Sequence, residues 1–368
     1  MKRNVLMCIP DLGICNGVTS FMLSFYDYLI EQEYSVDFLV VEDQHMEKES
    51  YVTEKGSRVF RVPIAAKYDK SRIEFIDKVF RENAYDIVHV NFPGPNGAMV
   101  LKAAKKWGVK HRIYHCHNPL NLLSLKSTLS ERVFTPICRS RANKFLACSK
   151  SAGISIFGNR DFQVINNAIE PRDFVFDAKA RERVRKSLQL ESQMVVGVAA
   201  RMEAQKNPSF IVEVFAEMKK KCKDAVLVWV GDGGMQKQIE EACVAKNIRD
   251  AVFLVGRQPD VTEWYSAMDL FLLPSRYEGL GIVFLEAQAN GLPTFGSDCV
   301  PEETQITHLM HRISLEKSAA QWADEIWNIY DRQQGERMVD IDLFRKHGFD
   351  VNYSKDKLYV VYESLYQE

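Results

Sequence analysis

Two basic residues follow a short apolar run and precede a helix-start signal in the second half of the chain. The run Val195–Ala199 predicts a buried strand, and Arg201 and Lys206 come shortly after it. Asn207 suits the position before a helix and Pro208 suits its first turn. Both cations would then lie beside the positive end of a helix dipole, where anions are stabilised. An arginine fork and a lysine point charge could together clamp a diphosphate, and the alternative is a pair of solvated surface cations.

A second passage combines a glycine-containing loop with two glutamates. The apolar run Leu270–Leu273 predicts another buried strand, and the loop Gly279-Leu280-Gly281 follows it before an apolar helical stretch. Loop amides and a helix N-terminus together form an anion site. Glu278 stands at the start of that helix, and Glu286 lies within it among apolar residues. Because a buried carboxylate without a partner is costly, Glu286 needs either the hydroxyl pair of a ligand or a neighbouring cation.

These loops require a scaffold that brings strand ends together. Short apolar runs alternate with helical patterns along nearly the whole chain, and Val5–Ile9 and Ile87–Val90 are clear examples in the first half. This alternation predicts an α/β protein with doubly wound parallel sheets covered by helices on both faces. Ligands bind at the carboxyl ends of such strands, which is where the basic and acidic residues fall.

The length of the chain predicts two domains. A chain of 368 residues exceeds the size of a single ordinary core. The alternation breaks between residues 168 and 191, where a charged run over 177–186 precedes the next apolar run. We therefore expect a first Rossmann-like domain over 1–172 and a second over 173–351, followed by a helix over 352–368.

The motifs of the second half, taken in order, resemble those of one enzyme family. Seven residues separate Glu278 from Glu286, which matches the E-x7-E motif of the family 4 retaining glycosyltransferases. The passage Arg201–Asn207 is similar to the R…E-x-K-N loop of that family. Further motifs follow in the family's order: Gly231-Asp232-Gly233, Gly256-Arg257 and Asp269–Pro274. The likeness covers the whole C-terminal half, and the N-terminal half matches in outline.

This resemblance implies a fold and a reaction. The fold is GT-B, in which two Rossmann-like domains face a cleft and the final helix, over 352–368, crosses back to the first domain. The reaction is the transfer of a sugar from a nucleotide diphosphate to a saccharide or lipid-linked acceptor, with the anomeric configuration retained. It implies no cofactor and no divalent metal, and UDP is the first expectation for the donor, with GDP and ADP left open. A growing surface polysaccharide on a lipid carrier is the expected acceptor.

Carried over residue by residue, the resemblance places the donor in the second domain. Arg201 and Lys206 would hold the diphosphate. Glu286 would take the ribose hydroxyls, and Glu278 would contact the transferred sugar. The backbone groups near that sugar and the turn against the base would be Leu280, Gly281, Ile282, Gly256 and Arg257.

The first domain offers fewer matches. Gly13–Gly17 follow the first strand and open a helix, and Gly17 would let the backbone approach a phosphate or an acceptor. The pattern is not G-x-G-x-x-G, and Asn16 stands where the family often has a second glycine. His117 ends a strand and resembles the family's cleft histidine, which contacts the donor sugar. His115 is its rival, and a structural histidine at a strand end is the other interpretation.

Two short sequence motifs resemble metal-binding sites. His115-Cys116-His117 would place both histidines on one face of a strand, but the remaining zinc ligands do not occur at the usual spacing. Asp340-Ile341-Asp342 imitates a DxD motif in a charged, helical stretch, and we interpret it as coincidence. The sequence therefore predicts no metal site.

Charge and hydropathy limit the partners. The chain carries 48 basic and 49 acidic residues, which argues against a general nucleic-acid binder. No signal-peptide pattern is present and no run reaches the ~20 apolar residues of a membrane span, so we expect a protein that lies in the cytoplasm or against the inner face of the plasma membrane. Basic residues around Trp107 could hold the first domain against anionic lipid, and the alternative is a solvated helix face. This basic cluster comprises Lys102, Lys105, Lys106, Lys110, Arg112, Lys126, Arg132, Arg139, Arg141 and Lys144.

Two other functions stay open at this point. A sugar-nucleotide epimerase of the same fold would need a dense set of acid/base residues, and the sequence does not offer one. A non-catalytic, two-lobed sugar-nucleotide-binding protein is the second alternative. The apolar surroundings of Glu286 and the missing signal pattern count against a secreted binding protein.

Overall fold

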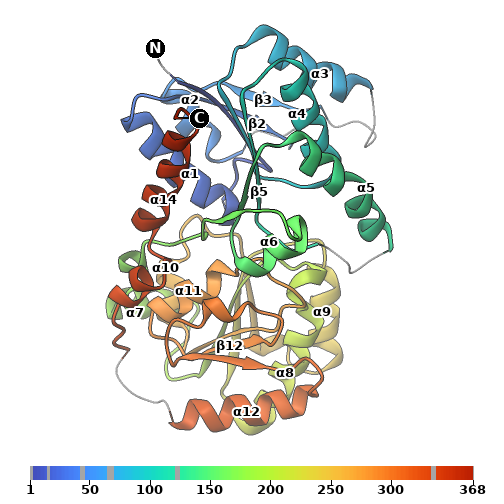
Figure 1. The fold of residues 1–368 in the computed structure, drawn as a ribbon. Coiled ribbons are helices and arrows are strands. Elements are labelled where there is room, and N and C mark those ends of the chain that lie inside the picture. Colours follow the sequence, from blue (N-terminus) through green and yellow to red (C-terminus); the bar gives the residue numbers. More distant parts are fainter. Residues whose placement is uncertain are drawn as a thin grey trace. The chain divides into compact units, whose positions relative to one another are not determined.

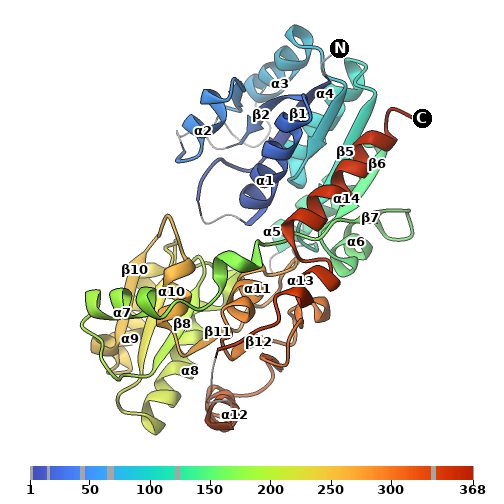
Figure 2. The same ribbon diagram turned by 90° about the vertical axis from the view of Figure 1, so that its left-hand side faces the viewer.

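The chain folds into two compact units. The computed structural model describes residues 3–14, 17–41, 46–63, 70–120, 125–332 and 337–367. Unit 1 consists of Met1–Ala168 with Val351–Glu368, and unit 2 consists of Ile169–Asp350. The observed boundaries follow residues 168 and 350. Those expected from the sequence, after residues 172 and 351, lie four residues and one residue further along the chain. Each unit is a parallel sheet with helices on both faces (Figures 1 and 2).

Unit 1 contains seven parallel strands in the order β3-β2-β1-β4-β5-β6-β7. In the centre, Val5 lies between Val36 and Ile87, and all three side chains are buried. The order reverses at β1 and β4, which is the switch point of a doubly wound sheet. The strands are β1 Asn4–Ile9, β2 Ser35–Val40, β3 Val59–Arg61, β4 Ile87–Val90, β5 His111–Cys116, β6 Lys144–Ala147 and β7 Gln163–Val164.

The helices of unit 1 include the last helix of the chain. The aromatic face of that helix, α14, packs on α1, where the rings of Phe25 and Tyr362 lie 5.1 Å apart, edge to face. Leu358 and Val361 of the same face are buried in the core of unit 1. The helices are α1 Gly17–Glu31, α2 Glu49–Glu54, α3 Lys70–Glu82, α4 Gly94–Lys106, α5 Leu125–Arg141, α6 Lys150–Phe157 and α14 Val351–Ser364.

Unit 2 contains six parallel strands in the order β10-β9-β8-β11-β12-β13. Its central strands are buried on both faces, as their continuous apolar runs predict. Gly197 in β8 has a packing reason, because a Cβ there would lie 2.0 Å from the sulfur of Met268. The strands are β8 Val195–Ala199, β9 Val226–Val230, β10 Val252–Gly256, β11 Leu270–Leu273, β12 Thr294–Ser297 and β13 Met310–Ile313.

The charged run over 177–186 forms a helix of unit 2. Asp177 caps this helix, α7, with a 2.8 Å bond to the amide of Lys179, and Ala180 and Val184 form its buried face. The helices of unit 2 are α7 Ala178–Ser187, α8 Pro208–Lys221, α9 Gln236–Ala245, α10 Thr262–Ala267, α11 Ile282–Ala289, α12 Ala319–Arg332 and α13 Asp342–Lys346. Short 3-10 turns are η1 Pro171–Phe174, η2 Ala204–Lys206, η3 Arg249–Ala251 and η4 Glu302–Thr304.

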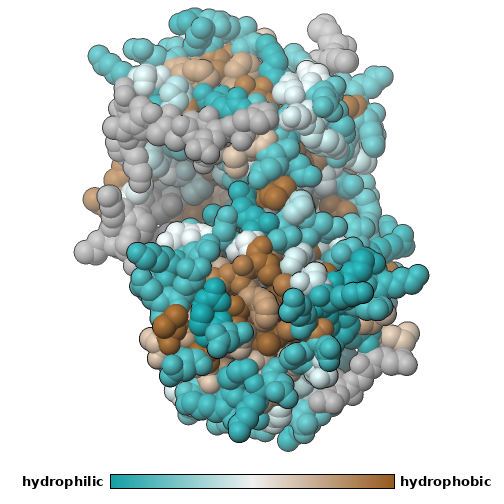
Figure 3. Space-filling model, turned by 180° about the vertical axis from the view of Figure 1, so that it is seen from behind, coloured by the Kyte–Doolittle hydropathy of each residue, from teal (hydrophilic) through white to brown (hydrophobic). Residues whose placement is uncertain are grey.

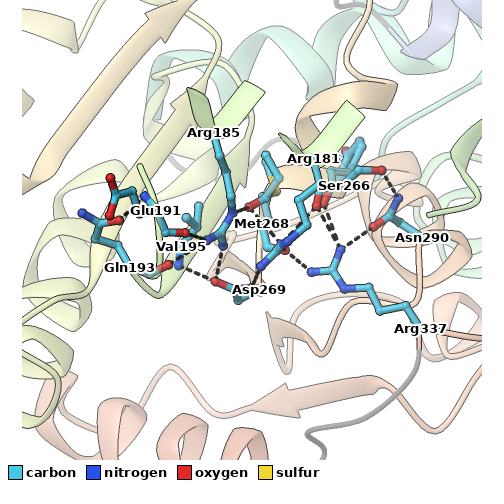
Figure 4. A network of polar contacts seen from close by, with 12 residues as sticks. Arg181, Arg185, Glu191, Gln193, Val195, Ser266, Met268, Asp269, Asn290 and Arg337 are labelled. Carbon is cyan, nitrogen blue, oxygen red and sulfur yellow. Dashed lines mark hydrogen bonds and ion pairs between the residues drawn. The ribbon is translucent and has the colours of Figure 1, made fainter. Parts of the chain in front are cut away.

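A carboxylate among arginines ties α7 and α10 to the amino ends of the central strands (Figure 4). Asp269 lies just before β11, and its two oxygens accept bonds of 2.6 Å from Arg181 and from Arg185. The same carboxylate accepts the amide of Val195, the first residue of β8, at 2.7 Å. Arg337 donates to Asn290 at 3.0 Å and to the carbonyl of Met268. These contacts define the Asp269 network. It lies at the amino ends of the strands, whereas the predicted site lies at their carboxyl ends.

The face of the molecule in Figure 3 is mostly hydrophilic, and the hydrophobic residues on it gather in separate patches. Within the described ranges, no helix combines the length and the apolar character that a bilayer crossing requires.

Candidate active site

Two loops at the carboxyl edge of the unit 2 sheet are bonded to each other. β8 and β11 are neighbouring parallel strands, so the loops that follow them emerge side by side. The backbone amide of Arg276 donates to the carbonyl of Gln205 at 2.8 Å. The side-chain amide of Gln205 donates in return to the carbonyl of Tyr277 at 3.1 Å. These bonds fix the loop that carries Lys206 against the loop that carries Glu278.

Lys206 and Glu278 form an ion pair in this position. Nζ of Lys206 lies 2.7 Å from Oε1 of Glu278. The Glu278 side chain is only 4% exposed and that of Lys206 is 16% exposed, so water screens the pair poorly. An ammonium group carries three N–H donors, which leaves donors of Lys206 for a further acceptor. The pair thus holds a cation in a fixed position at the sheet edge.

Arg201 and Asn207 show how the first loop differs from the expectation. Arg201 is exposed, and its side chain has no partner among the residues that the structure describes. Asn207 precedes α8, as expected, but its side chain does not cap the helix. Its backbone is left-handed (φ 56°), whereas a capping side chain needs an extended backbone. Its side-chain oxygen instead accepts Nε of Arg276 at 3.3 Å.

Glycines let the neighbouring loops approach this edge closely. A Cβ on Gly231, after β9, would lie 2.3 Å from the carbonyl oxygen of Ala200, and one on Gly233 would lie 2.7 Å from the Met202 amide. Gly256 ends β10 with φ 72°, and its carbonyl accepts the amide of Gly231 at 2.8 Å. The exposed Arg257 follows at once. The backbone of four strand ends therefore gathers here.

The Gly279-Leu280-Gly281 loop opens α11. Gly281 occupies the position before the helix with φ 84°, and a Cβ there would lie 2.6 Å from the ring of Phe284. The backbone amides of Leu280, Gly281 and Ile282 donate to no acceptor among the described residues. Free amides at a helix N-terminus favour an anion or a polar ligand oxygen.

Glu286 has a partner that the sequence did not indicate. One oxygen of its carboxylate, Oε2, accepts a 2.5 Å hydrogen bond from the hydroxyl of Tyr265 in α10. Burial raises the pKa of Glu286 to about 7, and the bond from Tyr265 opposes that rise. The residue as a whole keeps part of its surface exposed. The partner of Glu286 in the structure is therefore the neutral hydroxyl of Tyr265, whereas the sequence led us to expect a ligand hydroxyl pair or a cation.

In unit 1, His117 lies just past β5 and is buried. Its Nε2 lies 2.9 Å from Oδ1 of Asn91, and its Nδ1 lies 3.0 Å from the side chain of Asn167. Asn91 donates its amide hydrogens to the carbonyls of Cys8 and His89, so its oxygen faces His117 and Nε2 carries the ring hydrogen. Burial lowers the pKa of His117 to about 4. Burial therefore favours the neutral form of this ring at pH 7.

His115 lies deeper in the same sheet. Its ring centroid is 4.1 Å from that of His117, and its Nδ1 lies 3.2 Å from Nε2 of His89. His89 in turn meets the hydroxyl of Tyr362 at 2.8 Å. Burial lowers the pKa of His89 to about 3 and that of His115 well below its usual range. His117 is 6% exposed and His115 is fully buried, so His117 is the histidine nearer to the surface.

The predicted site residues fall into two groups. Those of the second half gather at the carboxyl edge of the unit 2 sheet, whereas Gly17 begins α1 and His117 follows β5, both in unit 1. Among the described residues, no group of three or more His, Cys, Asp or Glu side chains is arranged to hold a metal ion. Sequence reasoning missed Gln205, Asn91, Asn167 and Tyr265. Only the short distance from Gln205 to Lys206 in the chain could have drawn attention to any of them.

Comparison with known sequences covers both units. The family described as Glycosyltransferase Family 4 matches residues 15–172, and the family described as Glycosyl transferases group 1 matches residues 180–340. EpsF of Bacillus subtilis, which is named as a glycosyltransferase, is 26% identical over 94% of this chain and 93% of its own length. An Escherichia coli enzyme named UDP-Gal:alpha-D-GlcNAc-diphosphoundecaprenol alpha-1,3-galactosyltransferase is 24% identical over 78% of this chain and 77% of its own.

Solved structures share the whole fold. HepE of Anabaena, crystallised with UDP and glucose, superimposes with a TM-score of 0.81 at 16% identity, over 98% of this chain and all of its own. Sucrose-phosphate synthase of Thermosynechococcus elongatus also reaches 0.81 at 16% identity, over 100% of both chains. These likenesses establish the fold as GT-B. The two family matches, which span residues 15–172 and 180–340, show that this chain belongs to the glycosyltransferases that join a Glycosyltransferase Family 4 domain to a Glycosyl transferases group 1 domain.

Proposed function

We propose that this glycosyltransferase transfers a hexosyl group from a UDP-sugar, with retention of configuration and without a divalent metal. The observation that carries the proposal is the Lys206–Glu278 pair beside the free amides of the α11 N-terminus. A fixed cation and a helix dipole at one strand edge supply the charge that a leaving diphosphate needs. UDP in the HepE complexes and in the name of the E. coli relative supports the choice of nucleotide.

In this proposal, each predicted donor residue keeps a separate task. Lys206 and the exposed Arg201 bind the diphosphate, and Glu286 accepts the ribose hydroxyls. Glu278 is held by Lys206 and Gln205 so that it can accept hydroxyl groups of the transferred sugar. The turn at Gly256 and Arg257 lies against the base. The roles implied for Gly17 and His117 in unit 1 stay predictions.

The proposed reaction exchanges one C–O bond for another. The bond between the anomeric carbon and the diphosphate oxygen breaks, and the acceptor oxygen bonds to the same face of that carbon. The acceptor proton moves to the departing phosphate oxygen, and UDP leaves. Positive charge develops on the sugar, and Lys206 and Arg201 stabilise the negative charge on the diphosphate. Glu278 positions the sugar in this scheme and forms no covalent bond to it.

We further propose a lipid-linked or saccharide acceptor that meets unit 1 at an anionic membrane. The acceptor in the E. coli relative's name is a diphosphoundecaprenol. Trp107 after α4 and two residues of α5, Leu129 and Val133, are exposed, by 40%, 65% and 47%. Exposed lysines of the basic cluster flank Trp107, and the exposed Arg132 precedes Val133, although Arg112 turns inward to three backbone carbonyls. Apolar side chains beside basic ones suit a headgroup layer.

Nucleotide binding tests the donor assignment. UDP, GDP and ADP are added to the protein with EDTA, and the unfolding temperature is recorded. A ligand at a hundredfold excess over its Kd stabilises the protein by about 3 kcal/mol. We expect UDP to raise the unfolding temperature in EDTA, and Arg201→Ala/Lys206→Ala to abolish the rise. Lys220→Ala, which breaks an exposed pair with Glu217, is the control and should respond as the wild type does. No rise with any nucleotide would refute the donor site.

Sedimentation with lipid vesicles tests the membrane assignment. Each basic residue near an anionic surface contributes about 1 kcal/mol, so binding should require anionic lipid and weaken with salt. We expect the wild type to sediment with anionic vesicles and Trp107→Ala/Leu129→Ser/Val133→Ser to stay in solution. Val244→Ser, an exposed valine of unit 2, should bind like the wild type. Equal sedimentation with neutral vesicles, or none with anionic ones, would contradict the assignment.

A further inference from the structure

A tyrosine outside the predicted site holds one of its glutamates. Tyr265 in α10 is fully buried, and its hydroxyl donates to Oε2 of Glu286 at 2.5 Å. The other carboxylate oxygen, Oε1, has no partner among the described residues. Glu286 keeps part of its surface exposed, whereas Tyr265 does not. The tyrosine therefore touches the carboxylate from inside the protein, where no ligand reaches.

The position of this hydroxyl is fixed from several sides. The ring of Tyr265 meets Phe174 edge to face at 5.8 Å and Phe271 at an equal centroid distance. Its neighbour Ser266 accepts a 3.2 Å bond from the side chain of Asn290, at the end of α11. Arg337 donates both to Asn290 and to the carbonyl of Ser266 (Figure 4). These contacts bond α10 to α11, so the distance between hydroxyl and carboxylate depends on a rigid frame.

We propose that Tyr265 is a positioning residue for nucleotide recognition: it occupies Oε2 of Glu286 and leaves Oε1 to accept the ribose hydroxyls. The inference rests on the proposed function, which places the ribose at Glu286. Without the hydroxyl, the carboxylate can rotate about its last side-chain bonds and lose the orientation that a vicinal diol requires. An unmade bond to a buried group is costly, so this orientation affects affinity directly.

The charge of Glu286 depends on the same contact. Helix α10 also carries Glu263, which is paired with Arg183, and the adjoining turn η1 carries the exposed Arg172 and Asp173. Strand β12 carries no ionisable side chain. Of all these groups, Tyr265 alone shifts the pKa of Glu286, and it lowers that pKa while burial raises it to about 7. Ribose recognition by a carboxylate should therefore strengthen as the pH rises through about 7.

The test compares UDP with 2′,3′-dideoxy-UDP by calorimetric titration. Both carry the same base and diphosphate. The Kd of 2′,3′-dideoxy-UDP divided by the Kd of UDP therefore reports the contribution of the ribose hydroxyls alone. Tyr265→Phe keeps the ring and removes the hydroxyl. We expect it to lower this ratio by about fivefold to tenfold. Tyr330→Phe, on α12, is the matched control and should leave the ratio unchanged.

Two further measurements separate positioning from general packing. In a Glu286→Gln background, Tyr265→Phe should no longer change the ratio, because in this inference Tyr265 affects ribose binding through the carboxylate of Glu286. The ratio should rise with pH in the wild type, and its midpoint should move upward in Tyr265→Phe. If Glu286→Gln lowers the ratio and Tyr265→Phe does not, the inference is wrong and the proposed function stands. If Glu286→Gln leaves the ratio unchanged, the ribose assignment itself is wrong, and the inference fails with it.

Discussion

Replacing Lys206 with alanine should lower turnover of a UDP-sugar by about 10²–10³-fold, the usual cost of removing one preorganised charged donor. Lys206 is held 2.7 Å from Glu278 at the edge where the diphosphate is proposed to lie. The loss should fall mainly on the chemical step, because charge on the leaving group develops in the transition state. Initial rates at saturating donor would measure it. Lys220→Ala, on the exposed helix surface, should keep wild-type turnover.

The same substitution should also reduce stability, and a double variant separates the two effects. Glu278 is 4% exposed, so losing Lys206 leaves a buried carboxylate unpaired at a cost of about 1–3 kcal/mol. Lys206→Met/Glu278→Gln removes both charges and should recover most of that stability. It should not recover turnover. A double variant with near wild-type turnover would show that the pair is structural only.

Replacing Asp269 with asparagine should lower the free energy of unfolding of unit 2 by about 3–5 kcal/mol, as expected when one partner of a buried ion pair is removed. The carboxylate neutralises Arg181 and Arg185 and accepts the first amide of β8. The side chain of Arg185 is only 9% exposed, so its charge would remain buried without a counterion. Tertiary contacts of α7 and α10 with the sheet would weaken together.

An exposed pair between the same two helices provides the control. Arg183 of α7 and Glu263 of α10 are bonded at 2.6 Å, but both side chains are about half exposed. Glu263→Gln should therefore change stability by about 0–1 kcal/mol. Four of the five tryptophans lie in unit 2, so urea unfolding followed by tryptophan fluorescence reports mainly on that unit. Equal midpoints for Asp269→Asn and Glu263→Gln would contradict the role given to the network.

The central strands could be predicted from the sequence because burial on both faces requires continuous apolar runs. Val195–Ala199 and Leu270–Leu273 form β8 and β11 with the expected bounds. The edge strands β3 and β7 have three residues and two, too few for any periodicity to show. We did not predict helix α7 from the charged run over 177–186, because only a narrow face of this helix is buried. Charge content alone did not reveal that pattern.

The site could be predicted only as far as strand order determines it. Loops after adjacent parallel strands must meet, which brought Lys206 and Glu278 to one edge as expected. Their direct pairing, and the bond from Tyr265 to Glu286, depend on side-chain directions that motif spacing does not contain. Asn207 had the right position but a left-handed backbone, which turned its side chain away from the helix.

Titration of UDP and of uridine into the wild type and Arg201→Ala/Lys206→Ala, in EDTA, tests the central claim most directly. The two ligands differ by the diphosphate. The Kd of uridine divided by the Kd of UDP, compared between the two proteins, therefore measures what Arg201 and Lys206 contribute to diphosphate binding. We predict that the wild type binds UDP far more tightly than uridine, and that the variant binds both with similar affinity. Retention of the full preference for UDP in the variant would place the diphosphate elsewhere and contradict the account.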